Sequence, residues 1–125
     1  MKLHPDRVNA GNVISRHAPG SVQVNDETWR ESVVVPWQGK VQAWRGASAA
    51  GMTREHFDQL AELQPELVIF GSGSRLRFPS AELLRALIER GIGFETMDTA
   101  AACRTYNVLV GEARRVVAAL VIEGE

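Results

Sequence analysis

The amino-acid sequence predicts an α/β fold whose first third is a β meander. Two strand-to-helix junctions carry this prediction. The apolar run Leu67–Phe70 enters the turn Gly71-Ser72-Gly73, and a second strand-like run, Phe94–Met97, enters a polar segment that starts at Asp98. A third observation is the alternation of apolar and polar residues over Ser21–Asn25, which is typical of a half-buried strand.

Length and composition fit one domain that spans residues 1–125. The chain has 125 residues, of which 45% are apolar and 23% are charged, and a net charge of −1. No overall field therefore attracts nucleic acid or an anionic membrane. The N-terminus lacks the apolar core of a signal peptide, and the longest apolar run, Val116–Ile122, is too short to span a bilayer. We expect a soluble cytoplasmic protein with no nucleic-acid partner and no membrane span.

The first third of the chain predicts a flexible N-terminal arm followed by short strands. Residues 1–12 are polar and contain Pro5 and Gly11, which favours an arm without regular structure. Pro36 ends the longest predicted strand, because proline donates no hydrogen bond to a β ladder. The predicted strands are Val13–Arg16, Ser21–Asn25, Trp29–Val35 and Val41–Trp44.

The rest of the chain alternates helices with strands. Three helices are expected: the first begins after the capping residue Thr53, the second starts at Pro79-Ser80, and the third is capped by Asp98 or Thr99. The strands between and after them are Glu66–Phe70, Gly93–Met97 and Arg115–Ile122. The first two strands and the helix between them form a βαβ unit, which is almost always right-handed with parallel strands. The short connection before Arg115 places the last strand in the same sheet.

Three stretches of the sequence resemble a known family. They are residues 67–73, Phe78-Pro79-Ser80, and residues 97–109. They resemble the domain-of-unknown-function family that includes mitochondrial complex I assembly factor 3 and adipogenesis-associated proteins, with similarity over residues 12–122. The resemblance implies a three-layer fold with a mixed central β-sheet, a meander packed to one side, about three helices, and a final strand antiparallel to most of its neighbours. It implies no activity, but the mitochondrial relative acts by binding partners, which favours a protein-interaction role.

The glycine turn is the first candidate site. Gly71 and Gly73 can adopt positive φ, and a tight turn around Ser72 presents backbone N–H groups that can bind an anion. Arg75 and Arg77 follow at alternate positions and add positive charge. The spacing matches neither a dinucleotide fingerprint nor a P-loop, because the helix begins too far downstream and no Gly-Lys-Ser/Thr ending is present. The simpler interpretation is that the glycines only turn the chain.

A second candidate group is Asp98, Arg104 and Asn107. Asp98 is expected at the same sheet edge as the glycine turn, where open α/β sheets bind ligands. Arg104 and Asn107 are three residues apart on a predicted helix, so together they can hold a carboxylate or a partner's backbone. The alternative interpretation is that Asp98 caps the helix and Arg104 pairs with it or with a nearby carbonyl group.

The other reactive side chains form no catalytic or metal-binding set. Cys103 lies beyond the first helical turn with no histidine near it in sequence, so we expect a buried cysteine rather than a nucleophile. The three histidines lack metal-ligand spacing, so no metal or cofactor is expected. Trp37 follows Pro36 beside a turn and is expected to pack in the core or to act as an exposed anchor for a partner.

Two functions fit these observations. The first is a non-catalytic protein-interaction or assembly-factor-like module, which uses the edge with Gly71–Arg77, Arg104 and Asn107 or the face with Trp37. The second is a binder of, or weak enzyme on, a small anionic ligand at the edge formed by Gly71-Ser72-Gly73 and Arg104. The lack of a complete catalytic set favours the first function.

Overall fold

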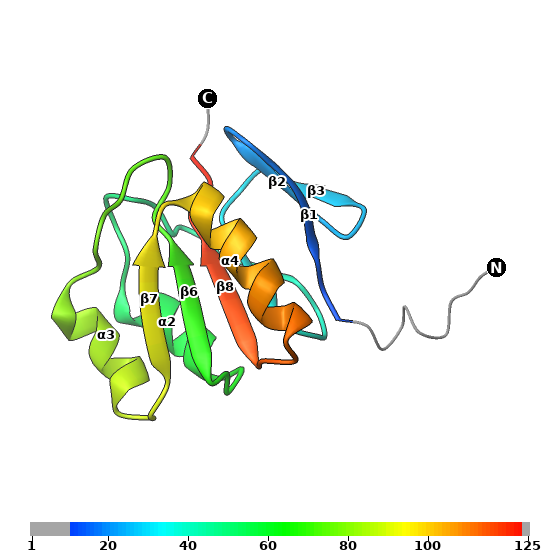
Figure 1. Cartoon of the computed structure of the whole chain (residues 1–125). Coiled ribbons are helices and arrows are strands. Elements are labelled where there is room, and N and C mark those ends of the chain that lie inside the picture. Colours follow the sequence, from blue (N-terminus) through cyan, green and yellow to red (C-terminus); the bar gives the residue numbers. More distant parts are fainter. Residues whose placement is uncertain (1–10, 124–125) are drawn as a thin grey trace.

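The computed structural model describes residues 11–123, in which three helices and two β-sheets form three layers (Figure 1). The smaller sheet is an antiparallel meander in the order β1-β2-β3, and the larger sheet has the order β5-β4-β8-β6-β7. This mixed α/β architecture confirms the predicted fold class. The strands are β1 (Ile14–Ala18), β2 (Ser21–Val24), β3 (Glu27–Trp29), β4 (Val33–Pro36), β5 (Gln42–Ala43), β6 (Leu67–Gly71), β7 (Gly93–Met97) and β8 (Val116–Leu120). The helices are α2 (Arg54–Ala61), α3 (Ala81–Ile88) and α4 (Thr99–Gly111).

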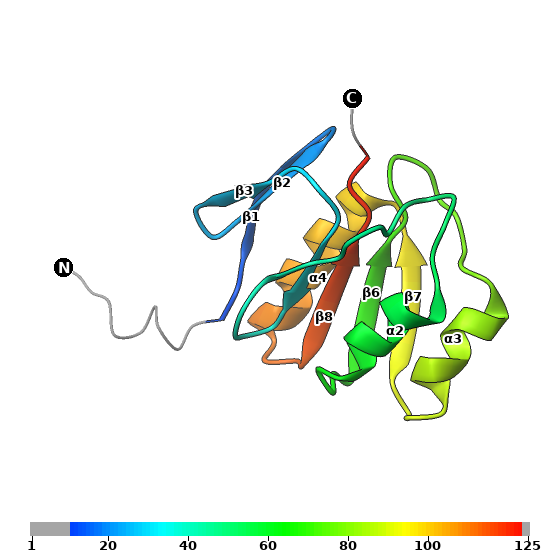
Figure 2. The ribbon, with the colours of Figure 1, turned by 180° about the vertical axis from the view of Figure 1, so that it is seen from behind.

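Strand β6 lies between β7 and β8 and is parallel to both. Helix α3 connects β6 to β7, and α4 carries the chain back past β6 to β8. The first connection moves along the sheet from β6 to β7, and the second moves back in the opposite direction from β7 to β8. Two right-handed connections that move in opposite directions place their helices on opposite faces of a sheet. Accordingly, α4 covers one face, while α2 and α3 cover the other (Figures 1 and 2). The predicted βαβ unit is confirmed.

The direction of β8 corrects one expectation from the family resemblance. We expected this strand to run antiparallel to most of its neighbours, but it is antiparallel only to β4 and parallel to β6. The reason is that α4 returns the chain to the end of the sheet at which β6 and β7 begin. The third strand of the βαβαβ series must then run in the same direction as the first two.

The strand predicted over Trp29–Val35 is in fact two strands in different sheets. β3 ends at Trp29 and β4 begins at Val33. Between them Ser32 is buried, and its hydroxyl donates a hydrogen bond to the Ala47 carbonyl oxygen at 2.9 Å. Because the chain crosses between the sheets here, β4 and β5 pair within the central sheet, and only β1 to β3 form the meander.

The two faces of the central sheet carry separate apolar cores. In β4, Val34 contributes to the core under α2 and α3, whereas Val33 and Val35 contribute to the core under α4 and the meander. This alternation follows from the period of two in a strand that is buried on both faces. Major members of the first core are Trp44, Phe57, Leu60, Phe70 and Leu87, and those of the second are Val22, Ile69, Tyr106, Val116 and Leu120.

Helix α4 is tied to the first strand of the meander by side-chain hydrogen bonds. The Asn107 amide nitrogen donates to the Ile14 carbonyl oxygen at 2.7 Å, and its amide oxygen accepts from the Ile14 N–H at 3.0 Å. The buried Tyr106 hydroxyl lies 2.9 Å from the carbonyl oxygens of Asn12 and Pro36. These contacts join the meander to the layer that covers the central sheet.

The flexible arm predicted over residues 1–12 lies largely outside the described residues. Of the two that are described, Asn12 is 7% exposed. Its side-chain amide donates to the carbonyl oxygens of Pro36 and Gly39, both at 2.9 Å. Asn12 therefore lies within the packed part of the chain.

Candidate functional site

The carboxyl ends of β6 and β7 bring the glycine turn against the start of α4. The Ser72 N–H donates to the Met97 carbonyl oxygen at 2.9 Å. Gly73 and Thr99 exchange two bonds: the Gly73 N–H donates to Thr99 Oγ1 at 2.8 Å, and the Thr99 N–H donates to the Gly73 carbonyl oxygen at 2.9 Å. Asp98 is the N-cap of α4, and its side chain accepts a backbone N–H of the first turn. The two junctions thus meet at one edge of the sheet.

Close packing explains why glycine occupies two positions of this turn. A Cβ atom on Gly71 would lie 3.0 Å from Thr99 Cα and 3.1 Å from Ala102 Cβ, so β6 approaches α4 too closely for a side chain. Gly73 has φ +105°, which residues with a side chain rarely adopt. A Cβ atom on Gly73 would also lie 2.8 Å from the carboxyl carbon of Glu123.

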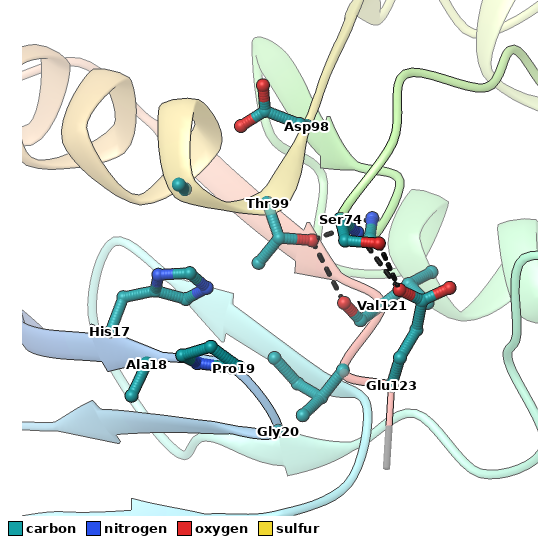
Figure 3. Close-up of a pocket in the computed structure, with 12 residues that line it drawn as sticks. His17, Ala18, Pro19, Gly20, Ser74, Asp98, Thr99, Val121 and Glu123 are labelled. Carbon is teal, nitrogen blue, oxygen red and sulfur yellow. Dashed lines mark hydrogen bonds between the residues drawn. The ribbon is translucent and has the colours of Figure 1, made fainter. Parts of the chain in front are cut away.

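A carboxylate of this chain, that of Glu123, lies at the glycine turn. Glu123 Oε1 accepts hydrogen bonds from the Ser74 N–H and the Ser74 hydroxyl, both at 3.0 Å (Figure 3). These two bonds, with smaller contributions from the charges of Arg77 and Arg75, lower the pKa of the Glu123 carboxyl group. The turn therefore has the donors that an anion needs, and Glu123 engages those of Ser74.

A buried serine shapes the exposed loop that follows the turn. Ser72 is 2% exposed, and its hydroxyl donates to the Arg75 carbonyl oxygen at 2.5 Å and accepts from the Arg77 N–H at 3.0 Å. The loop Arg75–Phe78 is exposed throughout. Leu76 is 55% and Phe78 is 73% exposed, which makes Phe78 the most exposed large apolar side chain in residues 11–123.

The predicted site residues do not share one pocket. Gly73 and Asp98 line a cleft of about 260 Å³ between the β1–β2 turn, the start of α4 and the C-terminal segment (Figure 3). His17 and Glu123 form part of its wall, whereas the Asp98 carboxylate accepts the Ala101 N–H and points away from the cleft (Figure 3). The negative charge of Glu123 at its margin is unfavourable for a small anion.

Four of the remaining predicted residues line two other hollows. Arg104 and Asn107 line a hollow of about 280 Å³ between α4 and β1, where Asn107 is already bonded to β1. Ser72 and Arg77 line a hollow of about 210 Å³ whose walls also include the loop before α2 and the start of α3. Arg75 lines neither hollow nor the cleft.

A larger hollow of about 660 Å³ lies at the opposite edge of the sheet. Glu66 in its wall accepts a hydrogen bond from the Arg115 N–H at 2.8 Å and from Arg114 Nε at 3.0 Å. These hydrogen bonds, the backbone one foremost, lower the pKa of the Glu66 carboxyl group. The arrangement joins the start of β6 to the start of β8, and we assign it a structural role.

Cys103 is buried in the core under α4 and the meander. Cys103 is 4% exposed, and burial raises the pKa of its thiol to about 12 although Arg104 is its neighbour. A thiol with this pKa is almost fully protonated at neutral pH and is a poor nucleophile. Within residues 11–123, no group of three His, Cys, Asp or Glu side chains is arranged to hold a metal ion. Trp37 is half-buried and packs against the core under α2 and α3.

Sequence reasoning overlooked three residues of this region: Leu76, Phe78 and Glu123. The signal for the first two was present, since large apolar residues alternate with arginines just before a proline. Glu123 carried no such signal, because it meets Ser74 across 49 residues of sequence.

No helix in the described part of the chain has the length and apolar character needed to cross a bilayer.

Comparison with known proteins groups this chain with one family. The model of the family described as "Protein of unknown function (DUF498/DUF598)" matches residues 14–121. A Danio rerio protein named NADH dehydrogenase (ubiquinone) 1 alpha subcomplex assembly factor 3 is 33% identical over 124 residues, which cover 97% of this chain and 70% of the relative. The Bos taurus protein of the same name is 39% identical over 83 residues, which cover 65% of this chain and 45% of the relative. A crystal structure of a Bordetella parapertussis protein superposes with a TM-score of 0.86 at 36% identity, covering 91% of this chain and 98% of that one.

Proposed function

This chain belongs to the DUF498/DUF598 family of proteins of unknown function, and on that premise we propose that it is a non-catalytic protein-interaction module of the assembly-factor kind. The observation that carries the proposal is the loop Arg75–Phe78, in which two exposed large apolar side chains alternate with two arginines. Phenylalanine and arginine are among the residue types that are enriched at protein interfaces.

The support of the loop fits a binding surface. The Ser72 hydroxyl holds two backbone groups of the loop, and Glu123 holds Ser74 just before it. A loop fixed in this way loses little conformational entropy when a partner binds. The names of the curated relatives, which describe assembly factors, agree with a role that depends on contacts with other proteins.

The geometry favours this function over a small anionic ligand. Both donors of Ser74 hold Glu123, and the Asp98 carboxylate caps α4. Arg104, which was expected to share the site, lines a different hollow. An anion at the turn would therefore have to displace Glu123 without help from Arg104.

The test is capture of a partner from the source cells by the tagged full-length chain. We expect a specific protein to be retained by the wild type and lost with Phe78→Ser. The matched control is Val108→Ser on α4, which removes another exposed apolar side chain, 59% exposed, away from the loop. Both substitutions are at exposed positions, so each should change the free energy of unfolding by less than about 0.5 kcal/mol. A partner that is lost equally with both variants, or with neither, would contradict the assignment to this loop.

A further inference from the structure

The chemistry of the exposed loop also indicates what kind of partner it binds. We propose that the loop Arg75–Phe78, with the hollow beside it, binds an extended segment of a partner protein in which acidic residues accompany large apolar ones. This inference rests on the proposed function and adds the partner's chemistry to it.

The charge of the loop favours an acidic segment. Arg75 and Arg77 are exposed, and neither forms an ion pair within 4.0 Å in residues 11–123. Within the chain their charges act on Glu123, and both guanidinium groups favour the ionised form of its carboxyl group. The loop carries two positive charges against this one carboxylate, so net positive charge remains on it. Arginine also presents a planar set of donors that suits bidentate contact with carboxylates.

The backbone of the loop favours an extended segment. The Ser72 hydroxyl engages the Arg75 carbonyl group and the Arg77 N–H, but the N–H and carbonyl groups of Leu76 form no hydrogen bond within residues 11–123. The loop is neither helix nor strand. These two unpaired backbone groups can hydrogen-bond the main chain of an extended segment, whose own N–H and carbonyl groups are free.

The shape of the neighbouring hollow favours an apolar side chain in that segment. The hollow has a volume of about 210 Å³, below the roughly 300–1,000 Å³ of small-molecule pockets. Phe78 and Arg77 line it, and its other walls include Met52, Phe70 and Leu83. It is therefore suited to one large apolar side chain rather than to a whole ligand. An acidic residue of the same segment would then lie close to the arginines.

An anionic membrane is the other partner that arginines and apolar side chains can attract, and the observations favour it less. Only two large apolar side chains project from the loop, and the chain as a whole has a net charge of −1. Stable attachment to a membrane surface needs more buried apolar area or a cluster of basic residues. The membrane is therefore an outcome for the experiment to test.

The experiment selects binders from a random 12-residue peptide library displayed on phage, with the full-length chain as the immobilised target. We expect selected peptides to be enriched in Asp or Glu together with Phe, Leu, Ile or Trp. A synthetic copy of the strongest peptide is then titrated in a fluorescence-polarisation assay against the wild type and variants. Arg75→Glu and Arg77→Glu should each weaken binding at least about tenfold, because like charges then face each other. Added salt should weaken the wild-type complex as well.

Arg104→Glu is the matched control, since it reverses another exposed arginine that lies outside the loop and its hollow. It should change peptide affinity less than about twofold, within the small effect of a distant screened charge. Selected peptides that are neutral or basic, no selected peptide at all, or affinity unaffected by the loop variants would each overturn the inference. Binding to vesicles with one third phosphatidylserine that Arg77→Glu abolishes, without any peptide binder, would overturn it in favour of a membrane.

The two proposals fail separately. If Phe78→Ser loses a captured protein while no acidic and apolar peptide is selected, the interaction module stands and the partner chemistry is wrong. If no protein depends on Phe78 and no peptide is selected, both are wrong. Circular dichroism of each variant confirms that lost binding is not lost folding.

Discussion

Substitution of Gly73 by alanine tests the glycine turn and its contact with Glu123 together. Two costs are expected. The first is the backbone strain of φ +105° for a residue with a side chain, roughly 1–3 kcal/mol. The second is displacement of Glu123, whose carboxyl carbon lies 2.8 Å from the position of the new Cβ. Since the Glu123 side chain can move, this cost is the loss of its two hydrogen bonds from Ser74, about 1 kcal/mol at a partly exposed site.

Gly39 offers a matched control. Its φ is +92°, and a Cβ atom there would have no neighbour within 4 Å. Gly39→Ala should therefore carry the backbone cost alone, and Gly73→Ala should destabilise the protein by about 1 kcal/mol more. The measurement is the free energy of unfolding in urea, supported by the Tm, which should differ by roughly 4 °C for that gap.

A double-mutant cycle with Glu123→Ala completes the test. In the Glu123→Ala background the hydrogen bonds of Ser74 are already absent, so the extra cost of Gly73→Ala should vanish and its effect should equal that of Gly39→Ala. Equal effects of the two glycine substitutions in the wild type would refute the contact with Glu123. A gap that persists without the Glu123 carboxylate would refute it as well.

Three further predictions concern α4 and the C-terminal segment. Asn107→Ala removes both hydrogen bonds to Ile14 and should lower the free energy of unfolding, measured in urea, by about 1–3 kcal/mol. The control Arg104→Ala, at an exposed position, should change it by less than about 0.5 kcal/mol. Equal effects would argue against the structural role of Asn107. Cys103, with its pKa raised to about 12, should resist iodoacetamide at pH 8 in the native protein and react in denaturant, as followed by mass spectrometry. The lowered pKa of Glu123 means that its contribution to stability is present above the unfolded value of 4.5 and is lost as the pH falls through the folded value. The stability difference between wild type and Glu123→Gln should accordingly shrink below pH 4.5, and a difference that grows on acidification would contradict the assignment.

The parts of the fold that depend on neighbouring residues were predictable from the sequence. The boundaries of β7 at Gly93 and Met97 match the prediction, and Asp98 caps α4 as one alternative had it. Periodicity and capping act within a few residues, so they can be read from the chain directly. The single strand predicted over Trp29–Val35 was wrong, because an apolar run does not reveal that its two ends join different sheets.

The candidate site was predictable only as far as its topology. Parallel pairing of β6 and β7 requires the glycine turn and Asp98 to lie at one edge, and they do. The sequence did not reveal that Arg104 faces a different hollow, because a helix of 13 residues carries its side chains away from the edge as it rises.

By itself the sequence determined the alternation of strands and helices, the positions of the turns and the burial of Cys103, since these follow from local propensity and hydrophobic pattern. Only the tertiary structure decided that Asn107 holds Ile14 across 93 residues and that Glu123 holds Ser74 across 49. Such partners are brought together by the packing of whole layers, and no local pattern specifies them. For the same reason, the exposure of Leu76 and Phe78 became known only once the fold showed which apolar residues the two cores leave uncovered.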